Sequence, residues 1–206
     1  MIAASLTQFM FFLLPIAGAM LLFEVDGTNE SQVKNDAAAI QQLCKEYQAI
    51  EIYTAENEEE SKRFWKIRKQ IPWTLKRISP HQSLEDVVVP IAYIPMMIER
   101  FKEIGEKYNV LIPCFGHAGD GNLHATPLKN PEHSDEHWDN ILPEILADIY
   151  RATAEMGGTI SGEHGIGHKR KGYMDLVMSK VQIEMMRSIK LALDPNNILN
   201  PGKIFD

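Results

Sequence analysis

The strongest fold signal in the chain is VLIPCFGHAGDGNLHATPL, residues 110–128. Two apolar runs flank the dipeptide Asp120-Gly121, and this arrangement is typical of a β-hairpin with a two-residue type I′ turn. A hairpin joins antiparallel strands, so the sheet is expected to be antiparallel or mixed rather than purely parallel.

The same hairpin predicts a pair of facing histidines. If Asp120 and Gly121 form the turn, His117 and His124 pair directly, on one face of the sheet, with Cβ atoms about 5 Å apart. Two imidazoles so placed can share one metal ion at about 2.1 Å each. A helix would separate them by about 10.5 Å along its axis, which is too far for a common ion. The alternative is a pair of histidines that are hydrogen-bonded within the sheet.

Helical and strand patterns alternate on both sides of the hairpin. Alternating or apolar runs predict strands at residues 19–25, 49–55 and 86–90. Apolar residues at helical spacing predict the following helices: about 29–47, 57 to about 72, 95–104, 134–156 and 180–193. Pro72 is expected to kink or end the second of these helices. The pattern predicts an α+β fold, in which helices cover an antiparallel sheet.

The composition is that of an ordinary globular protein. Of the 206 residues, 45% are hydrophobic and 24% are charged, which argues against wholesale disorder. The formal net charge of −7 argues against a protein that wraps nucleic acid phosphates. Cys44 and Cys114 lie in apolar-patterned segments, which suits a reducing, cytoplasmic compartment better than a disulfide framework.

The N-terminus departs from this average. Residues 2–23 carry no charge and are long enough to span a bilayer. A signal peptide would need a positively charged start, which is missing beyond the amino terminus, and Pro15 and Gly18 interrupt the run. We favour an apolar segment at residues 1–18 that packs on a protein surface or drives self-association. Peripheral attachment to a membrane, or a membrane span, is the alternative.

A second group of chemically active residues lies in SGEHGIGHKRKGYM, residues 161–174. Its glycines indicate a loop that either adopts positive φ or lets a ligand approach the backbone closely. Glu163 would complete a His–His–Glu ligand set that leaves positions open for chemistry. His164 would be available for proton transfer near neutral pH. The alternative is a surface loop whose Glu and His side chains are only solvated.

Other motifs narrow the chemistry. The dinucleotide fingerprint GxGxxG is missing from the required strand–turn–helix context, and the sequence contains neither a P-loop nor a GxSxG motif. Between residues 62 and 77 basic residues occur without one acid. Arg68 in this stretch could hold a carboxylate through two parallel hydrogen bonds, although most of the stretch must be helix surface.

Three motifs together resemble the C-terminal half of the FAD-linked 2-hydroxy-acid oxidoreductases. They are HAGDGNLH (117–124), SGEHGIG (161–167) and DPNNILNPGKIF (194–205). This family, of the vanillyl-alcohol oxidase type, includes the glycolate oxidase flavoprotein subunit, D-lactate dehydrogenases and D-2-hydroxyglutarate dehydrogenase. The resemblance covers about residues 19–205.

The resemblance implies a domain layout. Residues 19–168 would form a ferredoxin-like α+β cap or substrate domain with a large antiparallel sheet. Residues 169–206 would form a C-terminal helix and tail that return to an FAD-binding domain. Such a domain is not part of this sequence, so the resemblance implies that the chain needs an FAD-domain partner and is inactive without it. The reduced flavin would then pass electrons to an electron-transfer partner.

The resemblance also implies a metal and a base. Metal-containing members of the family would hold a divalent ion, Zn²⁺, Mn²⁺ or Fe²⁺, on the counterparts of His117, His124 and Glu163. The counterpart of His164 would be the catalytic base or a substrate contact.

Substrate and flavin contacts are implied in the same way. Arg68 matches an arginine that binds the substrate carboxylate, Asn122 lies in the turn motif beside the substrate, and Asn200 and Lys203 match the tail that approaches the flavin. Some dicarboxylate-specific relatives carry a lysine where this chain has Leu84, which favours a small acid such as glycolate or D-lactate.

Two other functions fit the residues alone. One is a flavin-free, metal-dependent hydrolase or lyase that uses His117, His124 and Glu163 with a bound water. The other is a non-catalytic domain that binds a carboxylate or a partner chain.

Overall fold

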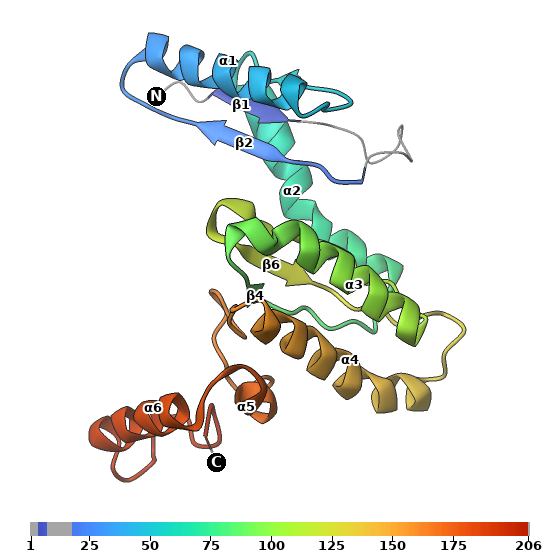
Figure 1. Ribbon diagram of the computed structural model, residues 1–206, viewed down its shortest axis with the longest axis vertical. Coiled ribbons are helices and arrows are strands. Elements are labelled where there is room, and N and C mark those ends of the chain that lie inside the picture. The colour runs from blue at the N-terminus through green and yellow to red at the C-terminus, as the bar shows by residue number, and fades with distance from the viewer. Residues whose placement is uncertain (1–3, 8–17, 206) are drawn as a thin grey trace. The chain divides into compact units, whose positions relative to one another are not determined.

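The computed structural model describes residues 4–7 and 18–205, and its helices and antiparallel strands confirm the predicted α+β class (Figure 1). The chain divides into two compact units, residues 1–74 and 75–206, and each is described by itself below. The division into functional parts at residues 18 and 168 stays a prediction.

The first unit contains a small antiparallel sheet with two helices, of which the second reaches into the next unit. Its described elements are β1 (Ala4–Thr7), β2 (Leu22–Val25), α1 (Glu30–Glu46), β3 (Tyr53–Thr54) and α2 (Glu58–Ile78). The strand order is β2-β1-β3. Asn29 caps α1 by accepting a hydrogen bond from the Gln32 N–H at 3.2 Å, and Val33 and Ala37 bury one face of this helix. The predicted strand at residues 49–55 is much shorter than expected.

Helix α2 does not end at Pro72. It runs unbroken from Glu58 to Ile78 with the proline in its interior. A proline withdraws only one intrahelical donor, and the turns on either side of it keep their own hydrogen bonds. Acidic residues in the first turn and basic residues in the last turn also complement the helix dipole.

The second unit contains the predicted hairpin and a hydrophobic core of buried side chains. Its described elements are β4 (Val87–Val88), α3 (Ile94–Tyr108), β5 (Cys114–His117), β6 (Asn122–Ala125), α4 (Asp135–Glu155), α5 (Met174–Val177) and α6 (Lys180–Leu193). Short 3-10 turns lie at 91–93, 118–120 and 171–173. All pairings in the sheet β4-β6-β5 are antiparallel.

Helices α3 and α4 pack against each other and against this sheet (Figure 1). Met97 and Phe101 of α3 meet Ile145 and Ile149 of α4, and these four side chains are at most 1% exposed. Burial of one large apolar side chain contributes roughly 1.5–3 kcal/mol, so this contact is the main support of the strands that carry the site.

The hairpin forms as predicted, but its turn is longer. Residues 118–121 make the turn, so His117 pairs with Asn122 and Phe115 pairs with His124. Gly121 adopts φ +72°, and its carbonyl accepts a hydrogen bond from the Val89 N–H at 3.0 Å. The neighbouring segment after β4 therefore fixes Gly121, and the prediction that His117 and His124 face each other directly is wrong.

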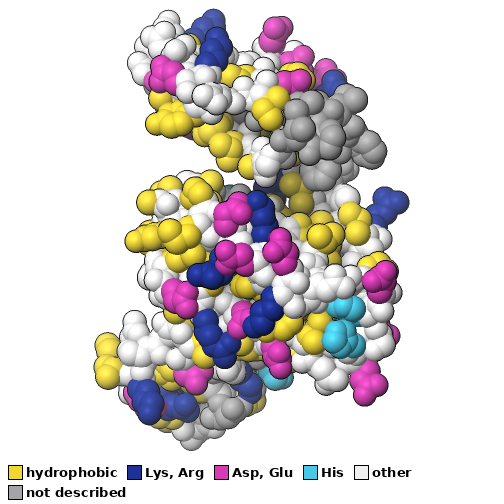
Figure 2. Space-filling view, turned by 45° about the vertical axis from the view of Figure 1, so that its right-hand side comes forward, with side chains coloured by type: hydrophobic (Ala, Val, Ile, Leu, Met, Phe, Trp, Pro, Cys, Tyr) yellow, Lys and Arg dark blue, Asp and Glu magenta, His cyan; other side chains and the backbone are white. Residues whose placement is uncertain are grey.

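The surface charges and the N-terminal segment relate to two classes of protein considered above, those that wrap nucleic acid and those that span a membrane. Acidic and basic side chains are interspersed on the face seen in Figure 2. Among the described residues, no helix is long and apolar enough to cross a membrane. Most of the predicted apolar segment at residues 1–18 lies outside the described residues, while the strand predicted at its end is present as β2.

Candidate functional site

Four side chains of the second unit bring their oxygen and nitrogen atoms within 4.8 Å of one another: Asp86, His124, Glu163 and His164. Asp86 precedes β4, His124 lies on β6, and the other two lie in the glycine-rich loop. Segments up to 78 residues apart in the sequence therefore meet at one point.

The two histidines and the glutamate form the open side of this cluster. The Nε2 atom of His124 lies 3.1 Å from Oε1 of Glu163, and Nε2 of His164 lies 3.5 Å from the same oxygen. The two imidazole rings stack with centroids 5.1 Å apart and planes at 6°. The side chain of His124 is 5% exposed, whereas that of Glu163 is 51% and that of His164 is 38% exposed. A ligand can therefore approach from the loop side while the strand side stays fixed.

Asp86 forms the closed side of the cluster. Its side chain is fully buried. Burial alone would raise the pKa of this carboxyl, but hydrogen bonds, first that from the His164 N–H and then those from Ser161 and Asn122, hold it well below its usual value. Asp86 therefore stays ionised inside the protein.

His117 lies beside the cluster rather than within it. It is the last residue of β5 and is exposed. Because it pairs with Asn122, it sits diagonally across from His124 on the same face, and the two ring centroids are 6.1 Å apart. The ring of His164 lies closer to His124, with a centroid distance of 5.1 Å. The role of His117 as a metal ligand stays a prediction.

Asn122 is the first residue of β6, and it is buried where the hairpin meets the glycine-rich loop. Its Nδ2 donates a hydrogen bond to Oδ1 of Asp86 at 2.7 Å. Its amide oxygen is buried and accepts no hydrogen bond from the residues that the structure describes. An acceptor of this kind suits a substrate hydroxyl, although contact with substrate stays a prediction.

The remaining predicted site residues lie outside this cluster. Arg68 is half-buried on α2 in the first unit. Asn200 and Lys203 are exposed in the C-terminal tail, where the Lys203 N–H donates to the Asn200 carbonyl at 3.2 Å. The tail returns to the glycine-rich loop, because the Ile204 N–H donates to the Gly167 carbonyl at 2.8 Å. The substrate role of Arg68 and the flavin roles of Asn200 and Lys203 stay predictions.

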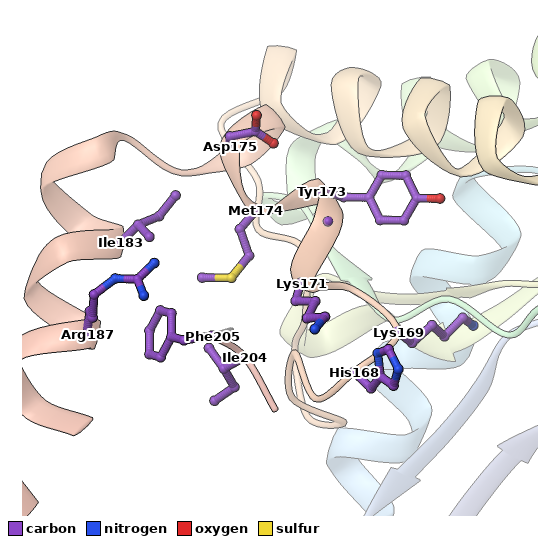
Figure 3. Close-up of a pocket in the computed structure, with 11 residues that line it drawn as sticks. His168, Lys169, Lys171, Tyr173, Met174, Asp175, Ile183, Arg187, Ile204 and Phe205 are labelled. Atoms are coloured by element: carbon purple, nitrogen blue, oxygen red, sulfur yellow. The ribbon is translucent and has the colours of Figure 1, made fainter. Parts of the chain in front are cut away.

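The tail also borders a cavity of about 590 Å³ (Figure 3). Its wall includes the cationic side chains of Lys169, Lys171 and Arg187. The guanidinium of Arg187 lies 4.9 Å from the ring centroid of Phe205, which closes one side of the cavity. The cavity shares no lining residue with the His–Glu–His cluster.

The residues of the cluster fit a divalent metal. Imidazole nitrogen and carboxylate oxygen are the donors that Zn²⁺, Mn²⁺ and Fe²⁺ accept. His124, Glu163 and His164 offer these donors from a partly buried position. His117 could add a further imidazole.

One member of the cluster was not expected from sequence. This member is Asp86, which is not among the site residues predicted from the sequence. Its signal was an acid that leads directly into the apolar run VVVP, because a charge in a buried strand must find partners.

Comparisons with known proteins show similarity along nearly the whole chain. The family model for the C-terminal domain of FAD linked oxidases matches residues 3–204. The glycolate oxidase subunit GlcD of Bacillus subtilis is 40% identical over 189 residues, which is 92% of this chain and 40% of that protein.

Two further relatives are dehydrogenases. A D-lactate dehydrogenase of Anaerostipes hadrus is 33% identical, with 91% of this chain and 39% of that protein covered. A D-2-hydroxyglutarate dehydrogenase of Stutzerimonas stutzeri is 29% identical, with 89% and 40% covered. The chain thus spans about two fifths of the length of these relatives.

Proposed function

Because this chain belongs to the family of FAD-linked oxidase C-terminal domains, we propose that it is the substrate- and metal-binding part of an enzyme that oxidises a small 2-hydroxy acid. Glycolate and D-lactate are the substrates we favour, because relatives are named for both and Leu84 takes the place of a lysine found in some dicarboxylate-specific relatives. Residues 19–168 would form the substrate part, and residues 169–206 would contact the flavin domain.

The observation that carries this proposal is the convergence of two imidazoles on one carboxylate oxygen. His124 and His164 both direct Nε2 toward Oε1 of Glu163, at 3.1 and 3.5 Å. His124 is buried and therefore fixed in position, whereas Glu163 and His164 are exposed and can contact a ligand.

These residues suggest a division of labour in the reaction. FAD would supply the hydride acceptor, and a divalent ion, which His124, Glu163 and His117 would hold, would supply positive charge to the substrate. His164, whose side chain is 38% exposed, would take the proton of the substrate's α-hydroxyl. Arg68 holds the substrate carboxylate, and the buried amide oxygen of Asn122 accepts a hydrogen bond from the substrate.

A flavin-free hydrolase or lyase would use the same donor set. The family match over nearly the whole chain favours the flavin-linked reaction. The cationic cavity beside the tail (Figure 3) is consistent with an anionic cofactor bound largely by a second domain.

The test is turnover in the presence of the flavin-binding part. The chain is co-expressed with an FAD-binding domain taken from one of its relatives. Reduction of an artificial electron acceptor is then measured with glycolate and with D-lactate. We expect His164→Asn to lower kcat by roughly 10²–10⁴-fold, as loss of a general base does, with the metal content unchanged.

His133→Asn is the matched control. His133 precedes α4, where its ring lies 4.6 Å from that of His137, and it has no part in the cluster. Its variant is expected to turn over like the wild type. Full activity of His164→Asn would remove His164 from the reaction.

A further inference from the structure

Asp86 gathers donors from two separate parts of the site. Its Oδ1 accepts from Nδ2 of Asn122 at 2.7 Å. Its Oδ2 accepts from Oγ of Ser161 at 2.7 Å and from the backbone N–H groups of three consecutive residues, Gly162 and Glu163 at 3.0 Å and His164 at 2.8 Å. The side chain is fully buried.

The donors to Asp86 are concentrated on one of its two oxygens. Four of the five reach Oδ2, which exceeds the two lone-pair directions of one carboxylate oxygen. Among the described residues, Oδ1 accepts a hydrogen bond from Asn122. The hydrogen bonds of Oδ2 therefore tie Asp86 to the backbone that carries Glu163 and His164.

The hydrogen bonds fix where the reactive side chains point. Because three successive N–H groups converge on one oxygen, the backbone at residues 162–164 has a single orientation. From this backbone Glu163 reaches Nε2 of His124, and the ring of His164 stacks on that of His124. His124 itself has Nδ1 at 3.7 Å from Oδ1 of Asp86, so the carboxylate also lies behind this ring. At 3.7 Å the two atoms are too far apart for a hydrogen bond, so the carboxylate acts on this ring through its charge.

The loop has no room to adopt this path differently. A Cβ atom on Gly162 would lie 2.3 Å from Nδ2 of Asn122 and 2.6 Å from Cγ2 of Val88. The backbone at Gly162 is therefore in close contact with these two strand residues, and it is also hydrogen-bonded to Asp86. Packing and hydrogen bonding select the same loop conformation.

We infer that Asp86 is a positioning residue that sets the arrangement of His124, Glu163 and His164 before an ion or substrate binds. This inference rests on the proposed function for the use of the cluster, but the arrangement itself is a property of this chain alone. Asp86 touches neither substrate nor flavin in this role.

The adjacent residue is a matched control. Glu85 is also a fully buried acid, but it binds a different set of groups: Oγ of Ser83 at 2.8 Å, the Tyr150 hydroxyl and Nζ of Lys169 at 2.6 Å. Glu85→Gln removes a buried negative charge next to the site without removing any acceptor of the 161–164 loop.

The first measurement needs no metal and no flavin. In the 206-residue chain, amide hydrogen exchange at Glu163 and His164 is followed by NMR for the wild type, Asp86→Asn and Glu85→Gln. In Asp86→Asn the loop donors meet a neutral amide oxygen, which accepts less strongly than a carboxylate oxygen, and an NH₂ group faces the Nδ2 donor of Asn122. We expect exchange at these two amides to become at least about 10-fold faster in Asp86→Asn, and to follow the wild type in Glu85→Gln once global stability is taken into account.

The second measurement is the affinity for Zn²⁺ alone, by calorimetry. Loss of a group that orients ligands weakens metal binding by about 10- to 100-fold, which is the effect expected of Asp86→Asn. Ser161→Ala keeps the charge of Asp86 and removes one donor, so it should weaken binding in the same direction by a smaller factor and remain folded. Glu85→Gln should bind Zn²⁺ like the wild type.

The outcomes distinguish a failure of the proposed function from a failure of the inference about Asp86. If the wild type binds no Zn²⁺, the metal part of the proposed function fails, and the amide exchange alone decides the role of Asp86. If exchange at Glu163 and His164 is unchanged in Asp86→Asn, or if Glu85→Gln and Asp86→Asn weaken Zn²⁺ binding equally, Asp86 is only a buried structural acid and the inference is overturned. If Asp86→Asn does not fold, Ser161→Ala with wild-type loop exchange and wild-type Zn²⁺ affinity overturns it in the same way.

Discussion

Asp86 keeps its negative charge although its side chain is buried. Burial acts to raise its pKa, and the hydrogen bonds to its two oxygens, led by the His164 N–H, more than offset this and hold the pKa well below the usual value. An unfolded chain offers none of these donors, so the ordinary pKa of about 3.9 returns on unfolding. The difference links this one residue to the acid stability of the second unit.

The sign of that linkage follows from the lowered pKa. The carboxylate contributes its full stability above the unfolded pKa, and this contribution is lost as pH falls from about 4 toward the folded pKa. We expect the free energy of unfolding of the wild type to fall over this acid range, and to fall less steeply for Asp86→Asn. Denaturant unfolding between pH 3 and pH 7 measures the slope. An equal slope in the two proteins would mean that the hydrogen bonds do not lower the pKa of Asp86.

At the scale of elements, the hairpin turn shows how a neighbouring segment can select a loop. Gly121 has φ +72°, and a Cβ atom there would lie 2.0 Å from the Val89 carbonyl oxygen. That approach lets Val89 bond the turn and gives a turn of four residues instead of two. The shift moves His124 from a position opposite His117 to one beside it, behind Glu163.

Two glycine substitutions within the turn test whether Val89 restrains it. Gly121→Ala combines positive φ with a backbone clash, so we expect it to lower the free energy of unfolding by more than about 2 kcal/mol. Gly119→Ala lies in the same turn, where an added Cβ meets no atom within 4 Å, and should change the stability by less than about 0.5 kcal/mol. Denaturant unfolding compares the two. Similar stabilities would show that the Val89 contact does not restrain the turn.

At the scale of the whole molecule, the chain leaves apolar surface without a covering element among the described residues. Val181, Met185 and Ile189 follow one another at four-residue spacing along α6 and are 70%, 62% and 61% exposed. Exposed apolar stripes of this kind mark interaction surfaces. Because these relatives are more than twice as long as this chain, the flavin domain is the partner we expect there.

The isolated 206-residue chain should therefore be colourless, inactive and self-associating. A few tail contacts, such as those of Asn200 and Lys203, do not offset the several kcal/mol of rigid-body freedom that cofactor binding costs. Absorbance in the flavin region after addition of FAD, turnover of glycolate and D-lactate, and light scattering test the three statements. A stoichiometric flavin peak, or turnover without a second domain, would show that the cofactor site lies largely on this chain.

Much of the architecture follows from local sequence. Helix starts at Asn29, Ser134 and Ser179 have the caps that their residue types predict, and apolar spacing predicted α1, α3, α4 and α6 because periodicity and capping act over a few residues. The hairpin, the α+β class and the meeting of His124 with Glu163 were also predictable. The last of these relied on motif order rather than on geometry.

Tertiary structure alone decided the register and the support of the site. The length of the turn depends on Val89, more than thirty residues earlier in the chain, and the position of Glu163 and His164 depends on Asp86, which lies 77 and 78 residues from them. The passage of α2 through Pro72 is likewise set by the turns around it rather than by the proline. Local patterns state which conformations a segment prefers, but a buried carboxylate can choose its donors only after distant segments have packed around it.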